Sequence, residues 1–512
     1  MKKKSLFLAS AATLLSLGCL TGCSLGSNSI VVWVGSESVK FYREEASKFL
    51  KANPDFGLKI SIVGADTGGA AGQMVSDNTA CGDIITVAHD NIGKLSQLSY
   101  IAPIIDEEVL AQIDADNPAA FKSVIKNILG DGRDGFTYTF GVPYISQALF
   151  LYYDTRYVTD EEAETFESLA VAAKRYDTEN GASGTRAVTV TGTDGFNFSF
   201  PLLARKLYNP DDETQNSSSL RIYEEGNPKD CYAQDNDQVA IMKWLQRYSA
   251  DPNGIYLTSG SKWETDIANH QAISVIGGAW HYNSFHDAVT DMDGNTHMGV
   301  KMIPTFTLTA DDVAGIEATS YPNDPDLPED LREAVDEAPV TGTKYRGGSF
   351  VDCKCFVINM TSIMGKNGPE KYTKMCKLLK YFSSKEVQND SFVEALNVPA
   401  YEGSSEFIES VKGQVEDTAY LMGKAQTGMG SYGISQPFLN ATLNANYYQD
   451  GAPDYYKNCI LKKDGAGSDV KGIREVLWRM EYVWKWGAPA ASSKYPTSYP
   501  AETHSKRHGS AA

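Results

Sequence analysis

Two apolar runs near the start of the chain end in ionisable and hydrogen-bonding side chains. Residues 82–91 read GDIITVAHDN, so an unbroken apolar run stops at His89, Asp90 and Asn91. Residues 29–38 read SIVVWVGSES and also end in polar groups, among them Glu37. Carboxylates and side-chain amides form hydrogen bonds with polar ligands, and the charged groups form the stronger ones. Polar residues at the ends of two apolar runs therefore indicate a binding edge.

The elements around these residues predict how they are positioned. Residues 41–55 show helical spacing of apolar side chains, and residues 58–63 alternate as a strand does. Together with the run at 29–34 they predict a β-α-β unit with parallel strands and an α/β fold. Strands covered on both faces read as continuous apolar runs, and ligands bind beyond their carboxyl ends. We therefore expect Glu37, His89, Asp90 and Asn91 at one edge of a sheet.

The rest of the chain contains further elements of the same kinds. Periodic apolar residues predict helices at 237–250, 369–382 and 470–485. Apolar runs predict strands within 141–154 and 272–280, the second ending in Trp280. Residues 351–358 read VDCKCFVI, and we interpret the two cysteines as buried on one side of a strand. The tail 491–512 is rich in Ala, Ser and Pro and is predicted to be disordered.

The first residues have the pattern of a bacterial export signal. Three lysines precede an apolar stretch that is too short to span a bilayer as a helix. Leu20-Thr21-Gly22-Cys23 resembles a lipobox, which implies removal of residues 1–22, lipidation of Cys23 and a flexible tether over 23–29. The alternative is an ordinary secretory peptide with a cysteine at this place by chance. The lipobox predicts a protein anchored to the outer face of the cell membrane and otherwise soluble.

Composition and missing motifs exclude several classes of function. The formal net charge of −19 disfavours binding to nucleic acid, because an acidic surface repels phosphate backbones. The sequence has no P-loop and no G-x-S-x-G nucleophile motif. Residues 290–299 lack the spaced acids of a calcium loop, so we expect a turn there. We expect no metal and no cofactor.

The motifs taken together resemble a known family. IVVWVGS, GDIITVAHDN, GVPYISQALFLYY, FNFSFPLL, AISVIGGAW and VKMIPTF follow one another as in bacterial solute-binding proteins of the maltose-binding type. The resemblance implies the two-lobed type II periplasmic-binding-protein fold, with a ligand cleft between the lobes and three crossovers near 141–145, 302–307 and 383–388. The first lobe would comprise 30–142 and 305–384, and the second lobe 143–304 and 385–490.

The resemblance also implies positions for ligand-binding residues. Asp90 corresponds to an aspartate that binds sugar hydroxyls, and Trp280 to a tryptophan that stacks on a sugar ring. Glu37, Gln147 and Asn197 match other cleft positions of the family. The family's maltose binders carry a tryptophan where this chain has Val87 and an arginine where it has Asn91, so a sugar other than maltose is expected. From the sequence segment GMGSYGISQPF we add Tyr432 and Phe438 as candidates for the far wall of the cleft.

These observations predict a monomeric, non-enzymatic carbohydrate receptor of an ABC importer. A sugar presents hydroxyls at its edge, which carboxylates and amides bind, and an apolar face, which an aromatic ring covers. The partners would be membrane permease subunits and, through them, a cytoplasmic ATPase. Two alternatives stay open. One is a lipid-anchored glycoside hydrolase, which needs two carboxylates about 5–10 Å apart, and the other is the same fold with a peptide or another small solute.

Overall fold

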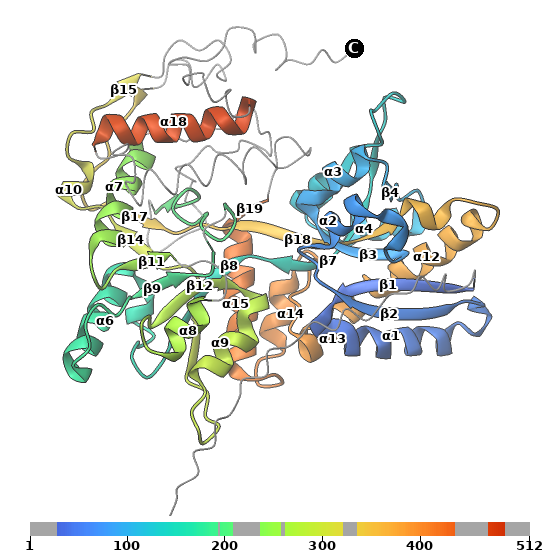
Figure 1. Cartoon of the computed structure of the whole chain (residues 1–512), viewed down its shortest axis with the longest axis horizontal. Helices are drawn as coiled ribbons and strands as arrows, with labels where there is room; N and C mark the ends of the chain where they lie inside the picture. Colours follow the sequence, from blue (N-terminus) through green and yellow to red (C-terminus); the bar gives the residue numbers. More distant parts are fainter. Residues whose placement is uncertain are drawn as a thin grey trace, which may run out of the picture.

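The computed structural model describes residues 28–192, 195–207, 236–257, 262–320, 335–435 and 469–486. The predicted signal peptide, Cys23, Phe438 and the predicted tail lie outside these ranges. The described residues form two α/β lobes that lie side by side, and long strands run from one lobe into the other (Figure 1). The predicted two-lobed α/β fold is thereby confirmed.

The first lobe is built on a sheet with the strand order β19-β18-β3-β1-β2, in which β4 and β7 also pair with β18. Its strands are β1 (Ser29–Gly35), β2 (Lys59–Ala65), β3 (Ile84–Ala88), β4 (Ile101–Ala102), β7 (Gly141–Gln147), β18 (Phe350–Asn359) and β19 (Ile434–Ser435). Its helices are α1 (Val39–Ala52), α2 (Ala70–Ser76), α3 (Ile92–Gln97), α4 (Glu107–Asp116), α5 (Ala119–Val124), α12 (Gly368–Phe382) and α13 (Lys385–Ala395), and β5 (Lys126–Ile128) pairs with β6 (Thr137–Thr139).

The register of this sheet explains why polar strand ends meet. Strand β1 pairs in parallel with both β2 and β3, with Val32 opposite Ile84 and Ile62. Aromatic residues from three elements fill the core beside β18, since Tyr42 of α1 lies 5.8 Å from Phe356 and 5.1 Å from Phe382 between ring centroids. Because parallel strands end at the same edge, the segments after β1, β2 and β3 lie together there.

The second lobe has a sheet of its own with the order β11-β9-β12-β8-β13. Its strands are β8 (Leu149–Asp154), β9 (Val188–Val190), β11 (Ile255–Leu257), β12 (Ser274–Gly278) and β13 (Met298–Lys301), and beside them β10 (Arg205–Lys206), β14 (Thr305–Thr307) and β17 (Lys344–Arg346) form a small antiparallel sheet. Its helices are α6 (Phe166–Asn180), α7 (Asn236–Ala250), α8 (Lys262–Ala268), α9 (Tyr282–Val289), α10 (Ala310–Val313), α14 (Ser404–Ser410), α15 (Asp417–Tyr432) and α18 (Val470–Trp486), and β15 (Thr319–Ser320) pairs with β16 (Val335–Asp336).

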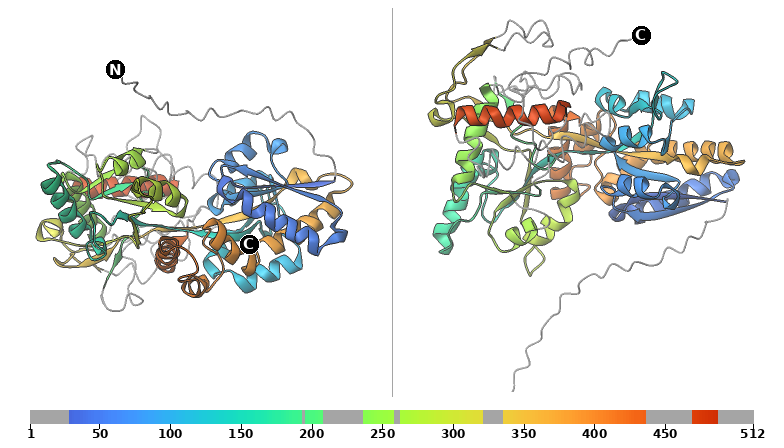
Figure 2. Two further views of the ribbon diagram at one scale, coloured as in Figure 1. Left: turned by 90° about the horizontal axis from the view of Figure 1, so that it is seen from below. Right: turned by 45° about the horizontal axis from the view of Figure 1, so that its top comes forward.

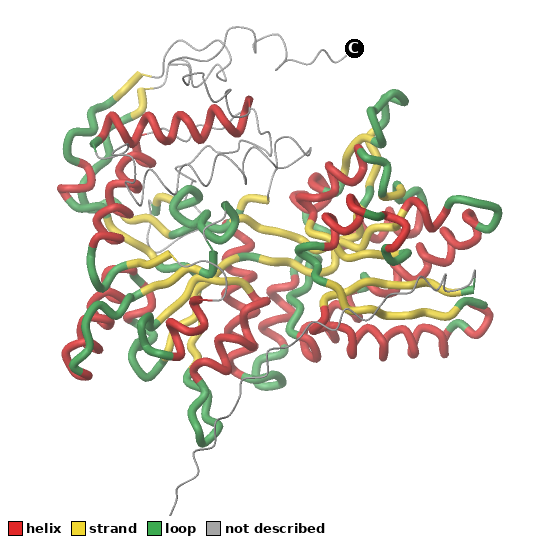
Figure 3. Tube along the Cα trace, viewed as in Figure 1, coloured by secondary structure: helices red, strands yellow, loops and turns green. Residues whose placement is uncertain are grey.

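Two antiparallel strands carry the chain between the lobes, as the strand colouring of Figure 3 makes visible. The first passage is the junction of β7 and β8, where Gln147 still pairs in the sheet of the first lobe and Ala148 already packs in the core of the second. The return passage is the start of β18, because Phe350 belongs to the core of the second lobe and Val351 to that of the first. The antiparallel pairing makes this double connection one continuous ribbon.

The second crossover therefore lies at 350–351 and not near 302–307, where the resemblance placed it. Phe306 of β14 stacks on Trp244 of α7 with ring centroids 3.9 Å apart, and Phe306 and Tyr345 both pack in the core of the second lobe. Residues 305–349 belong to the second lobe for this reason, wherever the structure describes them. The lobe boundary differs from the predicted one because it depends on packing between residues far apart in the chain, which a local sequence pattern does not show.

The third passage is spread over α13 and the residues after it. Val387 and Ala400 pack in the core of the first lobe, whereas Phe392 and Val398 pack in that of the second. The predicted crossover at 383–388 thus marks the beginning of a longer connection. Figure 2 shows from two further directions that the lobes stay apart except along these connections.

Candidate functional site

Three single turns of 3-10 helix carry residues of the candidate site. The turn Ser36–Ser38 follows β1, the turn His89–Asn91 follows β3, and the turn Ala279–His281 follows β12 of the other lobe. Each turn joins a strand to the helix that follows it, α1, α3 or α9. Their middle residues are Glu37, Asp90 and Trp280, and all three line one cavity between the lobes.

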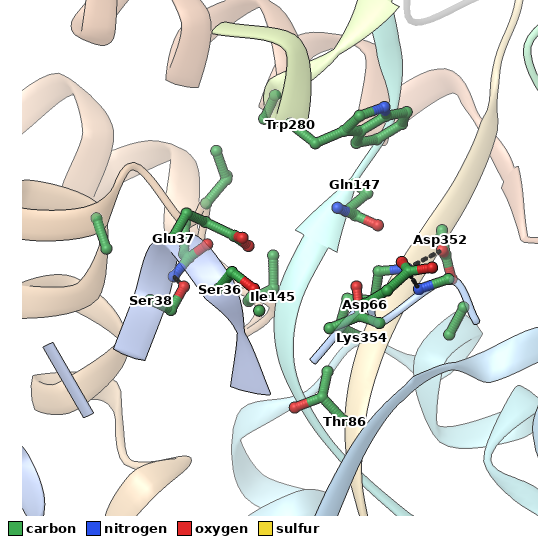
Figure 4. A pocket seen from close by; sticks show the side chains of 18 of the residues that line it. Ser36, Glu37, Ser38, Asp66, Thr86, Ile145, Gln147, Trp280, Asp352 and Lys354 are labelled. Atoms are coloured by element: carbon green, nitrogen blue, oxygen red, sulfur yellow. Dashed lines mark hydrogen bonds and ion pairs between the residues drawn. The ribbon is translucent and has the colours of Figure 1, made fainter. Parts of the chain in front are cut away.

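This cavity has a volume of about 830 Å³, within the range of pockets that enclose drug-sized ligands. Its walls come from both lobes and its floor from the strands that connect them (Figure 4). Among the residues that line it are Gly35, Glu37, Asp66, Thr86, Asp90, Asn91, Tyr144, Gln147, Phe196, Trp280, Asp352 and Lys354.

Carboxylates dominate the wall of the first lobe. Asn91 donates a hydrogen bond from Nδ2 to Asp90 Oδ1 at 2.9 Å, which orients the Asp90 carboxylate. A Cβ atom at Gly35 would lie 2.1 Å from Glu37 Oε1, so only glycine leaves room for the Glu37 side chain in this position. Asp66 follows β2 and accepts a hydrogen bond from the backbone N–H of Gly68 at 3.0 Å. These carboxylates present hydrogen-bond acceptors to the cavity.

A buried ion pair fixes the turn that carries Asp90. His89 Nδ1 lies 2.5 Å from Asp352 Oδ1 of β18, and the two side chains are 1% and 5% exposed. Burial alone would raise the pKa of Asp352, but nearby Lys354 and the hydrogen bond with His89 outweigh it and lower that pKa. His89 thus holds its loop against the sheet.

The floor of the cavity combines a buried hydrogen bond with a lysine. Thr86 Oγ1 and the Tyr144 hydroxyl lie 2.8 Å apart. Burial raises the pKa of Tyr144, so its hydroxyl keeps its proton and can donate a hydrogen bond. Lys354 of β18 reaches the same floor and is the only lysine or arginine among the described residues that line the cavity.

The wall of the second lobe is aromatic. Trp280 is 43% exposed, and its ring centroid lies 5.9 Å from that of Phe196 with the planes inclined at 41°. A Cβ atom at Gly278 would lie 2.1 Å from the indole, so the glycine allows the ring to fold back over the strand end. Beneath it, burial lowers the pKa of His281 to about 4, and the imidazole is therefore neutral at pH 7.

Comparisons with known proteins identify the family to which this chain belongs. The family model of bacterial extracellular solute-binding proteins matches residues 45–412. The chain belongs to this family. No curated protein matches it in sequence.

Several solved structures share the fold of this solute-binding protein at low sequence identity. The maltodextrin-binding protein MalE1 from L. casei BL23 without ligand is 16% identical, with a TM-score of 0.60 over 90% of this chain and 99% of that protein. MalX from Streptococcus pneumoniae in complex with maltopentaose is 16% identical, with a TM-score of 0.58 over 89% and 99%. MalE from Listeria monocytogenes in complex with maltose is 17% identical, with a TM-score of 0.57 over 88% and 96%.

The structure brings most of the predicted ligand-binding residues together. Glu37, Asp90, Asn91, Gln147 and Trp280 all line the cavity, although their part in binding stays a prediction.

The other predicted residues lie outside the cavity lining or outside the description. Asn197 is not among the lining residues, and its Oδ1 accepts a hydrogen bond from Thr191 at 3.0 Å, while the neighbouring Phe196 takes the place at the cavity. Tyr432 is the last residue of α15, and its side chain, like all of Phe438, is not described.

Sequence reasoning missed several cavity residues for which a signal existed. Asp66 directly follows β2, so the argument from polar strand ends applies to it as it does to Glu37 and Asp90. Asp352 and Lys354 alternate with Cys353 and Cys355 along β18, and both cysteines are fully buried, with their Sγ atoms 3.6 Å apart. Charged residues at every second position of an apolar strand indicate that one side of it faces a polar space.

Two other kinds of feature are absent from the described ranges. Within these ranges no helix has the length and apolar content needed to cross a bilayer. The same residues contain no group of three or more His, Cys, Asp or Glu side chains arranged to hold a metal ion.

Proposed function

We propose that this solute-binding protein is a lipid-anchored receptor that captures a carbohydrate, an oligosaccharide, in the interlobe cavity and delivers it to an ABC importer. The single observation that carries the ligand class is the exposure of Trp280. It is 43% exposed in a cavity lined by carboxylates, whereas Trp244 and Trp263 of the same lobe are at most 2% exposed. An exposed aromatic ring on the wall of a cavity offers apolar surface that the face of a sugar ring can cover.

The two walls match the two chemical aspects of a sugar ring. Glu37, Asp66 and Asp90 accept hydrogen bonds from hydroxyls at the edge of a ring, and such bonds to charged acceptors are the stronger ones. Trp280 and Phe196 offer apolar surface to the face of a ring. Closure of the lobes around the sugar is a hinge motion of the kind seen in periplasmic binding proteins. It would bring the walls together and exclude water.

The ligands of the structural neighbours support the same class. MalX is solved with maltopentaose and MalE from Listeria monocytogenes with maltose, and each shares the two-lobed fold with this chain. Asn91 and Val87 stand where maltose binders of the family carry arginine and tryptophan, so we propose a different sugar or chain length.

A thermal-shift screen over mono- and oligosaccharides tests the proposal. A ligand that binds only the native state raises the melting temperature by mass action. We expect a rise with at least one oligosaccharide, and mass spectrometry should recover the sugar intact. A shortened sugar would indicate a glycoside hydrolase instead, and a rise with peptides alone would indicate the same fold with a different solute.

We also propose that Cys23 carries the lipid and that the protein acts as a monomer with permease subunits and, through them, a cytoplasmic ATPase. A lipid anchor would keep the receptor close to the transporter after removal of residues 1–22. Metabolic labelling with a radioactive fatty acid should mark the wild type and not the Cys23→Ser variant. Labelling of both proteins would contradict the assignment of Cys23.

A further inference from the structure

Lys354 occupies a distinctive place in the cavity. It lies on β18, the strand that runs from one lobe into the other, and pairs in register with Ala88 of β3 and Ile145 of β7. Lys354 and Asp352 line the cavity, while the intervening Cys353 is fully buried in the core. The side chain therefore rises from the floor, between the carboxylate wall and the aromatic wall.

The ammonium group of Lys354 has hydrogen-bonding capacity that the protein does not use. Its side chain is only 13% exposed, and its nearest carboxylate oxygen, Asp352 Oδ2, lies 3.8 Å away. This distance is too long for a hydrogen bond, and no described residue accepts one from Nζ. An ammonium has three donors, and Lys354 Nζ is not one of the described polar atoms that are both buried and unpartnered, so the group is accessible from the cavity. Oxygen atoms that enter the cavity can satisfy its donors.

A neighbouring residue keeps Asp352 from moving into hydrogen-bonding distance of Lys354. Asp352 Oδ1 is held by His89 at 2.5 Å, so the carboxylate that could move toward Lys354 is already engaged in the core. In Figure 4 Lys354 and Asp352 lie side by side, with Gln147, which pairs with Asp352 across β7 and β18, next to them and Trp280 beyond it. The contact between His89 and Asp352 thus holds the carboxylate 3.8 Å from Lys354 Nζ and leaves the donors of the lysine available.

We propose that Lys354 is a specificity-determining residue, whose ammonium donates hydrogen bonds to oxygen atoms of a bound sugar that carries no acidic group. This inference rests on the proposed carbohydrate function and adds a residue and a ligand class to it. Four carboxylates, those of Glu37, Asp66, Asp90 and Asp352, line the same cavity as this one ammonium. A sugar acid would bring a further negative charge into that field, which like-charge repulsion disfavours. A hydroxyl can donate to the carboxylates and also accept from Lys354.

Titration calorimetry with three neutral sugars, maltotriose, cellotriose and raffinose, and with trigalacturonate as the acidic counterpart tests this inference. Wild type should bind at least one neutral sugar, and trigalacturonate should bind more weakly than that sugar. Lys354→Met keeps an unbranched side chain of similar shape, one atom shorter, and removes the donors, so we expect affinity for the neutral sugar to fall at least tenfold. Lys354→Arg, which keeps charge and donors, should recover part of the loss.

A matched control and a second variant separate binding from folding. Lys366→Met makes the same substitution at an exposed loop residue outside the cavity and should bind as wild type does. The melting temperature without ligand should be similar in Lys354→Met and wild type. Lys354→Gln serves as the test if the methionine variant does not fold.

The possible results distinguish this inference from the function on which it rests. If wild type binds none of the neutral sugars, both the proposed function and the role of Lys354 are wrong. If wild type binds one and the Met and Gln variants bind it equally well, only the role of Lys354 is wrong. Tighter binding of trigalacturonate than of every neutral sugar would overturn the ligand class.

Discussion

The first lobe meets the cavity with the turns after β1 and β3, whereas the second lobe meets it with the turn after β12. All three are strand-turn-helix units with a single turn of 3-10 helix. The middle residue is a carboxylate in the first lobe, Glu37 or Asp90, and an aromatic residue in the second, Trp280. The same backbone unit therefore provides a hydrogen-bonding wall on one side and a stacking wall on the other.

The two lobes also differ in what they bury behind these walls. Behind Asp90 lies the buried pair of His89 and Asp352, in which each side chain satisfies the polar group of the other. Next to Trp280 lies His281, which burial keeps neutral and whose ring lies 5.1 Å from that of Trp263. The pair of His89 and Asp352 thus lies behind the carboxylate wall. A neutral histidine, His281, packed against the ring of Trp263 lies behind the aromatic wall. Substitutions in each wall test whether the two lobes differ in this way.

The largest expected effect concerns the ion pair behind the first wall. Asp352→Ala leaves the buried His89 without its partner, and we expect unfolding free energy to fall by about 3 kcal/mol. Urea denaturation measures the change. The control is Asp287→Ala, which removes the partner of His286 in an exposed pair of the second lobe, where the aspartate side chain is 85% exposed. This control should change stability by less than about 0.5 kcal/mol, and equal losses in both variants would contradict the distinction.

Removing the aromatic wall should have the largest effect on binding. Trp280→Ala deletes the exposed ring, and we expect affinity for the best sugar of the screen to fall at least tenfold, about 1.4 kcal/mol. Trp280→Phe keeps an aromatic face and should retain more of the affinity. Phe136→Ala removes another exposed aromatic residue, outside the cavity, and should leave binding unchanged. Calorimetry that finds Trp280→Ala unaffected would remove the stacking wall from the comparison.

The carboxylate wall is tested by Asp90→Ala, for which we again expect at least a tenfold loss of affinity. Asp90→Asn keeps an acceptor without the charge, so it should lose less, because charged acceptors form the stronger hydrogen bonds. Asp55→Ala, at a position outside the cavity lining, is the matched control. If the alanine and asparagine variants both bind like wild type, the wall is formed by other residues.

A further expected effect is a difference between the lobes in their response to acid. The pKa of His281 is lowered from 6.5 to about 4, so its neutral form stabilises the fold above pH 6.5 and this contribution is lost as pH falls toward 4. The pKa of Asp352 is lowered from 3.8, so its contribution persists through that range and is lost only below pH 3.8.

Melting curves between pH 7 and pH 3 check this order. The His281→Gln variant should show a flatter decline than wild type between pH 6.5 and 4, and the same decline below it. A profile of His281→Gln parallel to that of wild type throughout would show that the second lobe does not respond through this histidine.

Local sequence patterns predicted the elements of this protein well. The helices expected at 237–250, 369–382 and 470–485 correspond to α7, α12 and α18, with bounds that differ by at most one residue. Their amphipathic spacing is a local property, and each buries the face that the spacing marks. The same holds for the apolar strands whose ends carry Glu37, Asp90 and Trp280.

Contacts between residues far apart in the chain were not predicted from the sequence. The position of the second crossover depends on the stacking of Phe306 on Trp244, two residues that the chain separates widely. The inclusion of Asp352 and Lys354 in the cavity depends on the register in which β18 lies against β3 and β7. A single sequence carries no record of either pairing.

Local sequence patterns are enough to show which segments become strands, which strand ends are polar, and that acids and aromatic residues are available there. Periodicity and side-chain chemistry act within a few residues, so they can be read directly from the chain. Only the tertiary structure decided that Glu37, Asp90 and Trp280 line the same space and that Lys354 stands on its floor. The physical reason is that the cavity belongs to two lobes, and its shape follows from the packing of residues far apart in the chain.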